Sequence, residues 1–264
     1  MSNNGPIGIF DSGIGGLSVA LEIRRELPHE QLLYVADSAH APYGDKPPDY
    51  IERRARAILT FFGEHGAKAV VVACNTATAV AIDALRAHWS VPIVAIEPAV
   101  KPAAAATRSG VVGVMATAQT IASTRFERLT DMFGTGVVIL AQPCPGLVER
   151  VEEGDLTGPA TRALVDQYVP PLVDKGADTI VLGCTHYPFL RDVIASVAGP
   201  GVTLIDPAGA VARELRRRLT ERDLLADPGE SPAIRFWTTG VPDQIHAVLG
   251  GLGVSAGDVQ PLGV

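Results

Sequence analysis

The chain has 264 residues, of which 47% are hydrophobic and 19% charged, so it can form one large or two medium-sized domains with a buried core. Its net charge of −7 provides no long-range attraction for nucleic acids or anionic membranes, although a local pocket can still hold a small anion. Three cysteines do not form a disulfide scaffold in a chain of this length, residues 1–6 lack a secretory pattern, and no apolar run predicts a membrane span. We therefore expect a cytoplasmic protein.

Short apolar runs alternate with helical patterns along the chain. We expect strands at residues 7–10, 32–35, 70–73, 93–96, 111–115, 137–141, 180–183, 203–205 and 234–238, and helices at residues 17–27, 49–63, 77–89, 120–133, 159–175 and 189–197. Strands that are apolar almost throughout and separated by helices are typical of parallel sheets covered on both faces. The pattern therefore predicts an α/β protein.

An internal repeat divides this pattern into two units. Residues 66–74 (GAKAVVVAC) match residues 176–184 (GADTIVLGC) without a gap, and four of the nine positions are identical. Generic helix–strand units also resemble each other, but both copies end in a cysteine followed by polar residues, which favours duplication. We expect two similar three-layer α/β/α domains with mainly parallel sheets. One comprises residues 1–98 and 208–264, the other residues 99–207, and the active site lies in the cleft between them.

Cys74 and Cys184 end the two repeat units at junctions between a strand and a polar turn. Ligands of parallel α/β sheets bind at the carboxyl ends of the strands, so the two sulfurs should face each other across the cleft. The amino end of a helix favours a thiolate, which makes each cysteine a candidate acid or base. Free cysteines are more often buried and inert, which is our interpretation of Cys144 between two prolines. Zinc would need clustered ligands, and only Cys184 and His186 are close in sequence, so we expect no metal.

Residues 11–16 (DSGIGG) follow the first strand and open a helix. Their glycines allow backbone amides to approach an anion. The spacing is close to a dinucleotide fingerprint, but Ser18 stands where the third glycine belongs, and Asp11 would lie near the pyrophosphate. A loop with a carboxylate, a hydroxyl and free amides suits a zwitterion better than a nucleotide. The alternative interpretation is a simple tight turn.

Further polar residues follow other strands. They are Asp37, His40, Tyr43 and Gly44 after the second strand, Asn75, Thr76, Thr185 and His186 beside the two cysteines, and Thr117 and Thr120 at the start of a helix. Each alone is more often a cap or a turn residue. Because the carboxyl ends of parallel strands meet at one edge of a sheet, together they predict a site for a small molecule.

Taken together, these segments resemble the glutamate racemase family. The resemblance rests on residues 9–17 (IFDSGIGGL), 42–44 (PYG), 74–77 (CNTA) and 183–188 (GCTHYP), which occur in the family's order and extend the match at least to Asp206. It implies two α/β domains with the site between them, no pyridoxal phosphate or metal, and production of D-glutamate for bacterial peptidoglycan. Some glutamate racemases also bind and inhibit DNA gyrase. We further expect a homodimer.

The same resemblance assigns roles to residues of this chain. It implies Cys74 and Cys184 as the catalytic pair, with Asp11, Glu152 and His186 as supporting groups and Glu153 as an alternative to Glu152. The implied substrate-binding positions are Asp11, Ser12, Tyr43, Gly44, Asn75, Thr76, Thr117, Thr120 and Thr185.

Racemisation by two cysteines requires one base on each face of Cα. The resemblance implies that Cys74 removes the proton of D-glutamate and Cys184 that of L-glutamate. Without an electron sink, preorganised donors such as Asn75, Thr76 and Thr185 must stabilise the negative charge that develops on the α-carboxylate. Asp11 can hold the α-ammonium, and His186 can move the proton of Cys184.

The rival functions are an aspartate racemase, or a related cysteine-pair isomerase, and a Cys–His hydrolase, which leaves the second cysteine unexplained.

Overall fold

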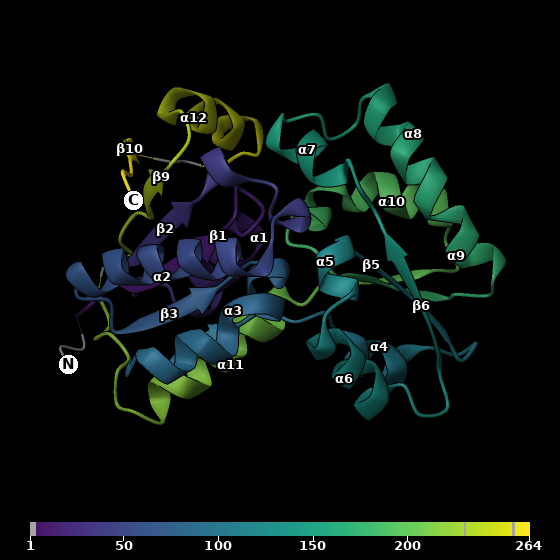
Figure 1. Ribbon diagram of the computed structural model, residues 1–264, viewed down its shortest axis with the longest axis horizontal. Helices are drawn as coiled ribbons and strands as arrows, with labels where there is room; N and C mark the ends of the chain where they lie inside the picture. Colours follow the sequence, from purple (N-terminus) through teal and green to yellow (C-terminus); the bar gives the residue numbers. More distant parts are fainter. Residues whose placement is uncertain (1–3, 230, 255–256) are drawn as a thin grey trace.

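The computed structural model describes residues 4–229, 231–254 and 257–264. The other residues of the chain, including 1–3 of the segment without a secretory pattern, lie outside the described part. The described chain forms two sheets of parallel strands flanked by helices, side by side in Figure 1. This is the α/β fold with two domains that the strand pattern predicts.

The first sheet has six strands in the order β10-β9-β2-β1-β3-β4. They are β1 (Ile7–Asp11), β2 (Leu32–Ala36), β3 (Ala69–Val72), β4 (Ile93–Ala95), β9 (Arg235–Thr238) and β10 (Val259–Pro261). The helices of this half are α1 (Leu17–Glu26), α2 (Pro48–Glu64), α3 (Asn75–His88), α11 (Ala208–Thr220) and α12 (Pro242–Gly251). Because α11 packs on α1 and β9 pairs with β2, the chain returns to the first half after crossing the second (Figure 1).

The second sheet has four strands in the order β6-β5-β7-β8. They are β5 (Val111–Ala116), β6 (Val138–Pro143), β7 (Thr179–Leu182) and β8 (Thr203–Ile205). Its helices are α4 (Val100–Ala106), α5 (Ala118–Ile121), α6 (Thr124–Phe133), α7 (Leu147–Glu152), α8 (Pro159–Tyr168), α9 (Pro170–Asp174) and α10 (Arg191–Ala198). On this basis we propose the domains predicted from the repeat, residues 1–98 with 208–264 and residues 99–207.

The internal repeat has a counterpart in the topology. The strands β2-β1-β3-β4 of the first sheet and β6-β5-β7-β8 of the second have the same order relative to the chain. Gly66 and Gly176 occupy the same place before β3 and β7, with positive φ values of 68° and 92°. Each glycine ends the preceding helix in a left-handed residue, which L side chains rarely adopt. The shared order and turn support duplication of one α/β unit.

Several predicted helices differ from the observed ones for local reasons. The predicted helix 120–133 is two helices, because the Ser123 hydroxyl accepts from the Phe126 amide at 3.1 Å and starts α6. The predicted helix 159–175 is α8 and α9, separated at Pro170 and Pro171, which cannot donate a helical hydrogen bond. The helix α11 begins at Ala208, the residue at which the sequence predicts the return to the first domain.

Four helices and one strand have no counterpart in the predicted elements. They are α4, α7, α11, α12 and β10. Apart from α11 they are short or lie in segments rich in glycine, and such segments have little periodicity to detect. Within the described residues, no helix is long and apolar enough to cross a membrane.

Candidate active site

The carboxyl ends of strands from both sheets line one small cavity between the domains. Its walls are Ser12, Pro42, Tyr43, Gly44, Cys74, Asn75, Thr76, Thr117, Val148, Cys184, Thr185 and His186. A volume of about 10 Å³ is open to a water-sized molecule, which is room for about one water. The structure thus brings most of the predicted site residues together in a closed arrangement.

Cys74 stands at the amino end of α3. Its sulfur accepts from the Ala77 amide at 3.4 Å and lies 3.6 Å from the Ser12 hydroxyl. Burial raises the pKa of the Cys74 thiol, and the nearby Asp11 carboxylate raises it further, against the lowering effect of the Ala77 amide. This closed site therefore favours the thiol form of Cys74, which is the form required of an acid.

Cys184 belongs to a chain of three groups. Its sulfur lies 3.7 Å from Nδ1 of His186, and Nε2 of the same ring lies 2.6 Å from Oε1 of Glu152. Burial acts against protonation of His186, but its hydrogen bonds to Cys184 and Glu152 outweigh this effect and raise the pKa of the ring. A protonated imidazole can therefore exchange a proton with the Cys184 sulfur.

Glu152 and Glu153 contact different partners. Glu152 ends α7 and reaches the buried His186, whereas Glu153 forms an ion pair with Arg150 at 2.7 Å near the surface. Neighbouring side chains on a helix point about 100° apart, so Glu152 faces His186 while Glu153 points toward Arg150. Glu152 lies behind His186 and does not line the cavity itself.

Asp11 is completely buried behind the cavity wall. Its carboxylate accepts from the Ser12 amide at 2.6 Å, from the Thr185 hydroxyl at 3.1 Å and from the Gly16 amide. Burial raises the pKa of Asp11, and Glu152 adds to this, while His186, Thr185 and Ser12 lower it. Asp11 thus orients Ser12 and Thr185, one from each domain. Contact with a substrate ammonium, as expected from the sequence, would require the site to rearrange.

The backbone amides of the glycine-rich loop, residues 11–16, donate hydrogen bonds to carboxylates of the protein itself. The Ile14 amide donates to Glu152 Oε1 at 2.7 Å, and the Gly16 amide donates to Asp11. A Cβ at Gly15 would lie 2.3 Å from the His186 ring. The sequence predicted a loop suited to a zwitterion. In this arrangement its glycines provide the space in which Glu152 and His186 of the second domain approach the first.

A hydroxyl cluster and an amide occupy the remaining wall. The hydroxyls of Thr76 and Thr117 are 3.0 Å apart, and the Thr117 hydroxyl donates to that of Thr120 at 2.9 Å, so Thr120 supports the wall from behind. The Asn75 side chain is buried, and neither its oxygen nor its nitrogen has a hydrogen-bond partner among the described residues. Because unpaired buried amides are costly, Asn75 is available for a polar ligand.

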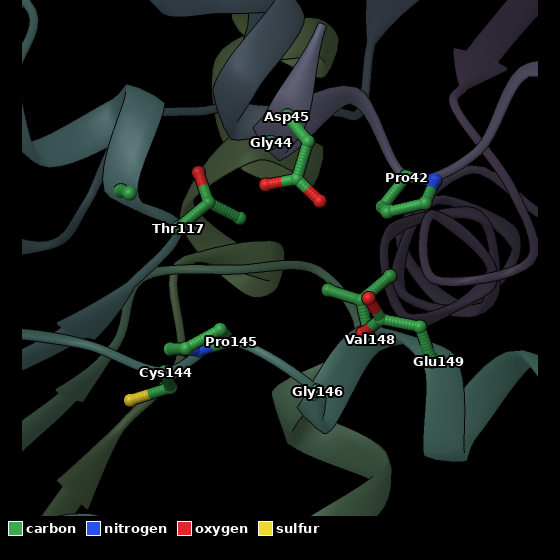
Figure 2. Close-up of a pocket in the computed structure, with 10 residues that line it drawn as sticks. Pro42, Gly44, Asp45, Thr117, Cys144, Pro145, Gly146, Val148 and Glu149 are labelled. Atoms are coloured by element: carbon green, nitrogen blue, oxygen red, sulfur yellow. The ribbon is translucent and has the colours of Figure 1, made fainter.

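An outer chamber of about 40 Å³ adjoins this cavity, and the two share Pro42, Gly44, Thr117 and Val148. Figure 2 shows the Asp45 carboxylate extending into the chamber and the Cys144 sulfur pointing away from it. The Cys144 sulfur donates to the Gln142 carbonyl at 3.3 Å. This geometry fits the structural interpretation of Cys144.

Sequence reasoning missed Pro42 and Val148 as wall residues. Pro42 was part of the PYG segment, and Val148 lies in α7, a helix of six residues that carries no periodic signal. Among residues 4–229, 231–254 and 257–264, no group of three or more His, Cys, Asp or Glu side chains is arranged to hold a metal ion.

Comparisons with known proteins agree on one family. Residues 17–215 match the family model described as Asp/Glu/hydantoin racemase. The chain is 56% identical over 258 residues to a glutamate racemase of Pseudomonas entomophila, covering 97% of this chain and 96% of the relative. A crystal structure of a glutamate racemase from Bacillus anthracis has a TM-score of 0.89 at 34% identity, covering 99% and 98% of the two chains. The structure of Francisella tularensis glutamate racemase in complex with D-glutamate has a TM-score of 0.86 at 30% identity, with coverage of 99% and 98%.

Proposed function

Because the chain belongs to the Asp/Glu/hydantoin racemase family, we propose that this amino-acid racemase interconverts L-glutamate and D-glutamate through two cysteines. The observation that carries the proposal is that Cys74 and Cys184, from equivalent places in the two domains, line the same cavity. The high identity to glutamate racemases over nearly the whole chain supports glutamate as the substrate.

Two sulfurs in one cavity can act on opposite faces of Cα. Cys184 removes the proton of L-glutamate, and Cys74, held as a thiol by burial, returns a proton to the other face. The roles are reversed for D-glutamate. The Glu152–His186 pair serves the Cys184 side, because His186 contacts that sulfur. The Cys74 side is served instead by Ser12, the Ala77 amide and, behind Ser12, Asp11.

The carbanion must be stabilised by groups that are already oriented. The unpaired Asn75 amide and the Thr76 hydroxyl line the cavity and can donate to the α-carboxylate, which stabilises its negative charge. The Thr185 hydroxyl now donates to Asp11 and would have to turn away from it to join them. The Asp11 carboxylate favours a positive charge on the substrate nitrogen, which makes the Cα proton more acidic.

The cavity must open before glutamate can enter, since the present volume holds about one water. Separation of the domains would widen it, and closure would then exclude water from the carbanion. The protein's own groups account for each proton transfer, so we propose catalysis without pyridoxal phosphate or metal. Activity should accordingly survive dialysis against EDTA, and the purified protein should show no visible absorption from a pyridoxal cofactor.

In the cell, this activity would supply D-glutamate for peptidoglycan synthesis from a cytoplasmic homodimer. Some glutamate racemases also inhibit DNA gyrase, and inhibition by this chain is tested separately from catalysis. A Cys74→Ser protein that still inhibits gyrase in a supercoiling assay would identify a binding effect independent of racemisation.

The decisive experiment is the reaction of L-glutamate in deuterated water. With two opposed bases, early product D-glutamate carries deuterium at Cα, while the remaining L-glutamate keeps its proton. Circular dichroism follows the loss of optical activity, and mass spectrometry of the separated enantiomers locates the label. A Cys144→Ser protein is the control. Equal early labelling of both enantiomers would indicate a single base, and faster turnover of L-aspartate than of L-glutamate would favour the aspartate racemase alternative.

A further inference from the structure

Asp37 is a buried carboxylate that the mechanism above does not use. It follows β2 directly, is completely buried, and its backbone amide donates to the Asp11 carbonyl at 3.0 Å. An isolated buried carboxylate is strongly unfavourable, so its partners determine whether this region keeps its structure.

Arg54 provides the positive charge that Asp37 needs. From helix α2, its Nε donates to Oδ2 at 3.0 Å and its terminal nitrogen donates to Oδ1 at 2.7 Å, with an exposed side-chain fraction of 12%. Two parallel hydrogen bonds fix the carboxylate plane as well as its position. The Thr239 hydroxyl donates to Oδ1 at 2.9 Å and supports the same orientation.

The third side-chain partner of Asp37 is Tyr43, whose hydroxyl donates to Oδ2. Burial raises the pKa of Tyr43, and the negative charge of Asp37 raises it further, so the phenol remains a donor. The ring is buried against Phe10, with centroids 6.2 Å apart. The Tyr43 hydroxyl is therefore directed at Asp37 and is not available to a ligand.

The contacts from Arg54 through Asp37 to Tyr43, called the tether below, hold the loop that forms one wall of the cavity. Pro42, Tyr43 and Gly44 all line it, and Gly44 lies against Thr117 of the other domain. The Tyr43 hydroxyl is held by Asp37, and Gly44 has no side chain. Tyr43 and Gly44 can therefore contact a substrate through their backbone groups. The position of these groups depends on the tether.

We propose that Arg54 is a positioning residue that holds the substrate loop of residues 42–44 in place through Asp37 and Tyr43. This proposal rests on the proposed function, because it assumes that the loop contacts glutamate. Without Arg54 the carboxylate loses its paired charge and its fixed plane, and the Tyr43 hydroxyl loses its defined acceptor. The loop then samples positions in which its backbone no longer meets the substrate.

The test compares Arg54→Met with Arg53→Met, a neighbour on α2 whose exposed side chain pairs with Asp49. We expect Arg54→Met to raise KM for L-glutamate about tenfold or more with a smaller effect on kcat, because small displacements of positioning groups have large effects. Hydrogen exchange of the backbone amides of residues 43–46, measured without substrate, should accelerate in Arg54→Met and stay unchanged in Arg53→Met. Arg54→Lys, which keeps the charge but not the paired geometry, should give intermediate values and covers the case in which Arg54→Met does not fold.

A double variant tests whether Arg54 acts through Tyr43. Tyr43→Phe should raise KM in the same direction, and adding Arg54→Met to it should produce little further change, because both alter one tether. The proposal is overturned if Arg54→Met and Arg54→Lys match Arg53→Met in KM and exchange, or if the effects of Arg54→Met and Tyr43→Phe multiply. If the wild-type protein does not racemise glutamate, the proposed function fails, while the exchange measurement still decides whether Arg54 holds the loop.

Discussion

Gly13 and Glu152 fit together only because Gly13 has no side chain. A Cβ at Gly13 would lie 1.8 Å from Oε1 of Glu152, the oxygen that also accepts from the Ile14 amide and contacts His186. The glutamate side chain is flexible in isolation, but here two partners fix its end. The loop of the first domain and the acid of the second domain therefore define each other's position.

Gly13→Ala should reduce kcat for racemisation at least about tenfold, because the new methyl group displaces Glu152 from His186 and keeps the domains apart. The protein should still fold, since the contact lies between domains and not within a core. The matched control is Gly63→Ala on α2, where a Cβ meets nothing within 4 Å. Steady-state kinetics of both variants provide the measurement, and equal activities would show that the fit is not required.

The two cysteines should divide the chemistry by substrate handedness. Replacing either by Ser should nearly abolish full racemisation, because a hydroxyl ionises far less readily than a thiol. A substrate with a leaving group at Cβ needs only proton removal. Cys74→Ser should therefore retain elimination from the L-form, and Cys184→Ser elimination from the D-form. If both variants prefer the same enantiomer, or Cys144→Ser is equally damaging, the assignment of opposed bases is wrong.

Asp11→Asn should lower kcat more than it raises KM, because the negative charge matters most when the carbanion forms. The oxygen of Asn could accept from only one of the Ser12 and Gly16 amides, and its NH2 group would face the other donor, so the loop becomes less ordered. The control is Asp45→Asn at the outer chamber. Unchanged kcat with a raised KM would instead indicate that Asp11 contributes to binding alone.

Asp178 should stabilise the second domain at neutral pH. Its carboxylate accepts from the Thr107 hydroxyl at 2.6 Å and from the Arg108 and Ser109 amides at 2.8 and 2.9 Å. These hydrogen bonds, the Thr107 bond first, lower the pKa of Asp178 well below its ordinary value. Asp178→Asn should reduce the free energy of unfolding by about 1–3 kcal/mol.

The sign of its pH dependence follows from the lowered pKa. The stabilisation is present above the unfolded pKa of about 3.9 and is lost as the pH falls through the folded value. Urea unfolding of wild type and Asp178→Asn should therefore differ most near neutral pH and converge in acid. Asp174→Asn, at an exposed position, is the control, and a difference that grows in acid would contradict this account.

The sequence alone determined the α/β class, the repeat and the residues gathered at the strand ends. Apolar strands have a recognisable pattern because parallel sheets are buried on both faces, and β1 and β3 are buried throughout. The place of Cys74 and Cys184 at two strand ends follows from that pattern, because ligands bind where parallel strands end. The division of the chain into α8 and α9, by contrast, depended on a local break at Pro170 that the longer helical pattern concealed.

Only the tertiary structure decided which polar groups meet across the domains. The sequence places Gly13 and Glu152 far apart and offers both Glu152 and Glu153, but the direction of a side chain on a six-residue helix depends on how that helix packs. Within the first domain, the sequence likewise does not show that the charges of Arg54 and Asp37 pair. The spacing of apolar residues along a sequence indicates which face of a helix or strand is buried, and this spacing is local and periodic. Pairing of charges and close approach of a glycine depend on distance in space, and that is fixed only when the two domains have folded and docked.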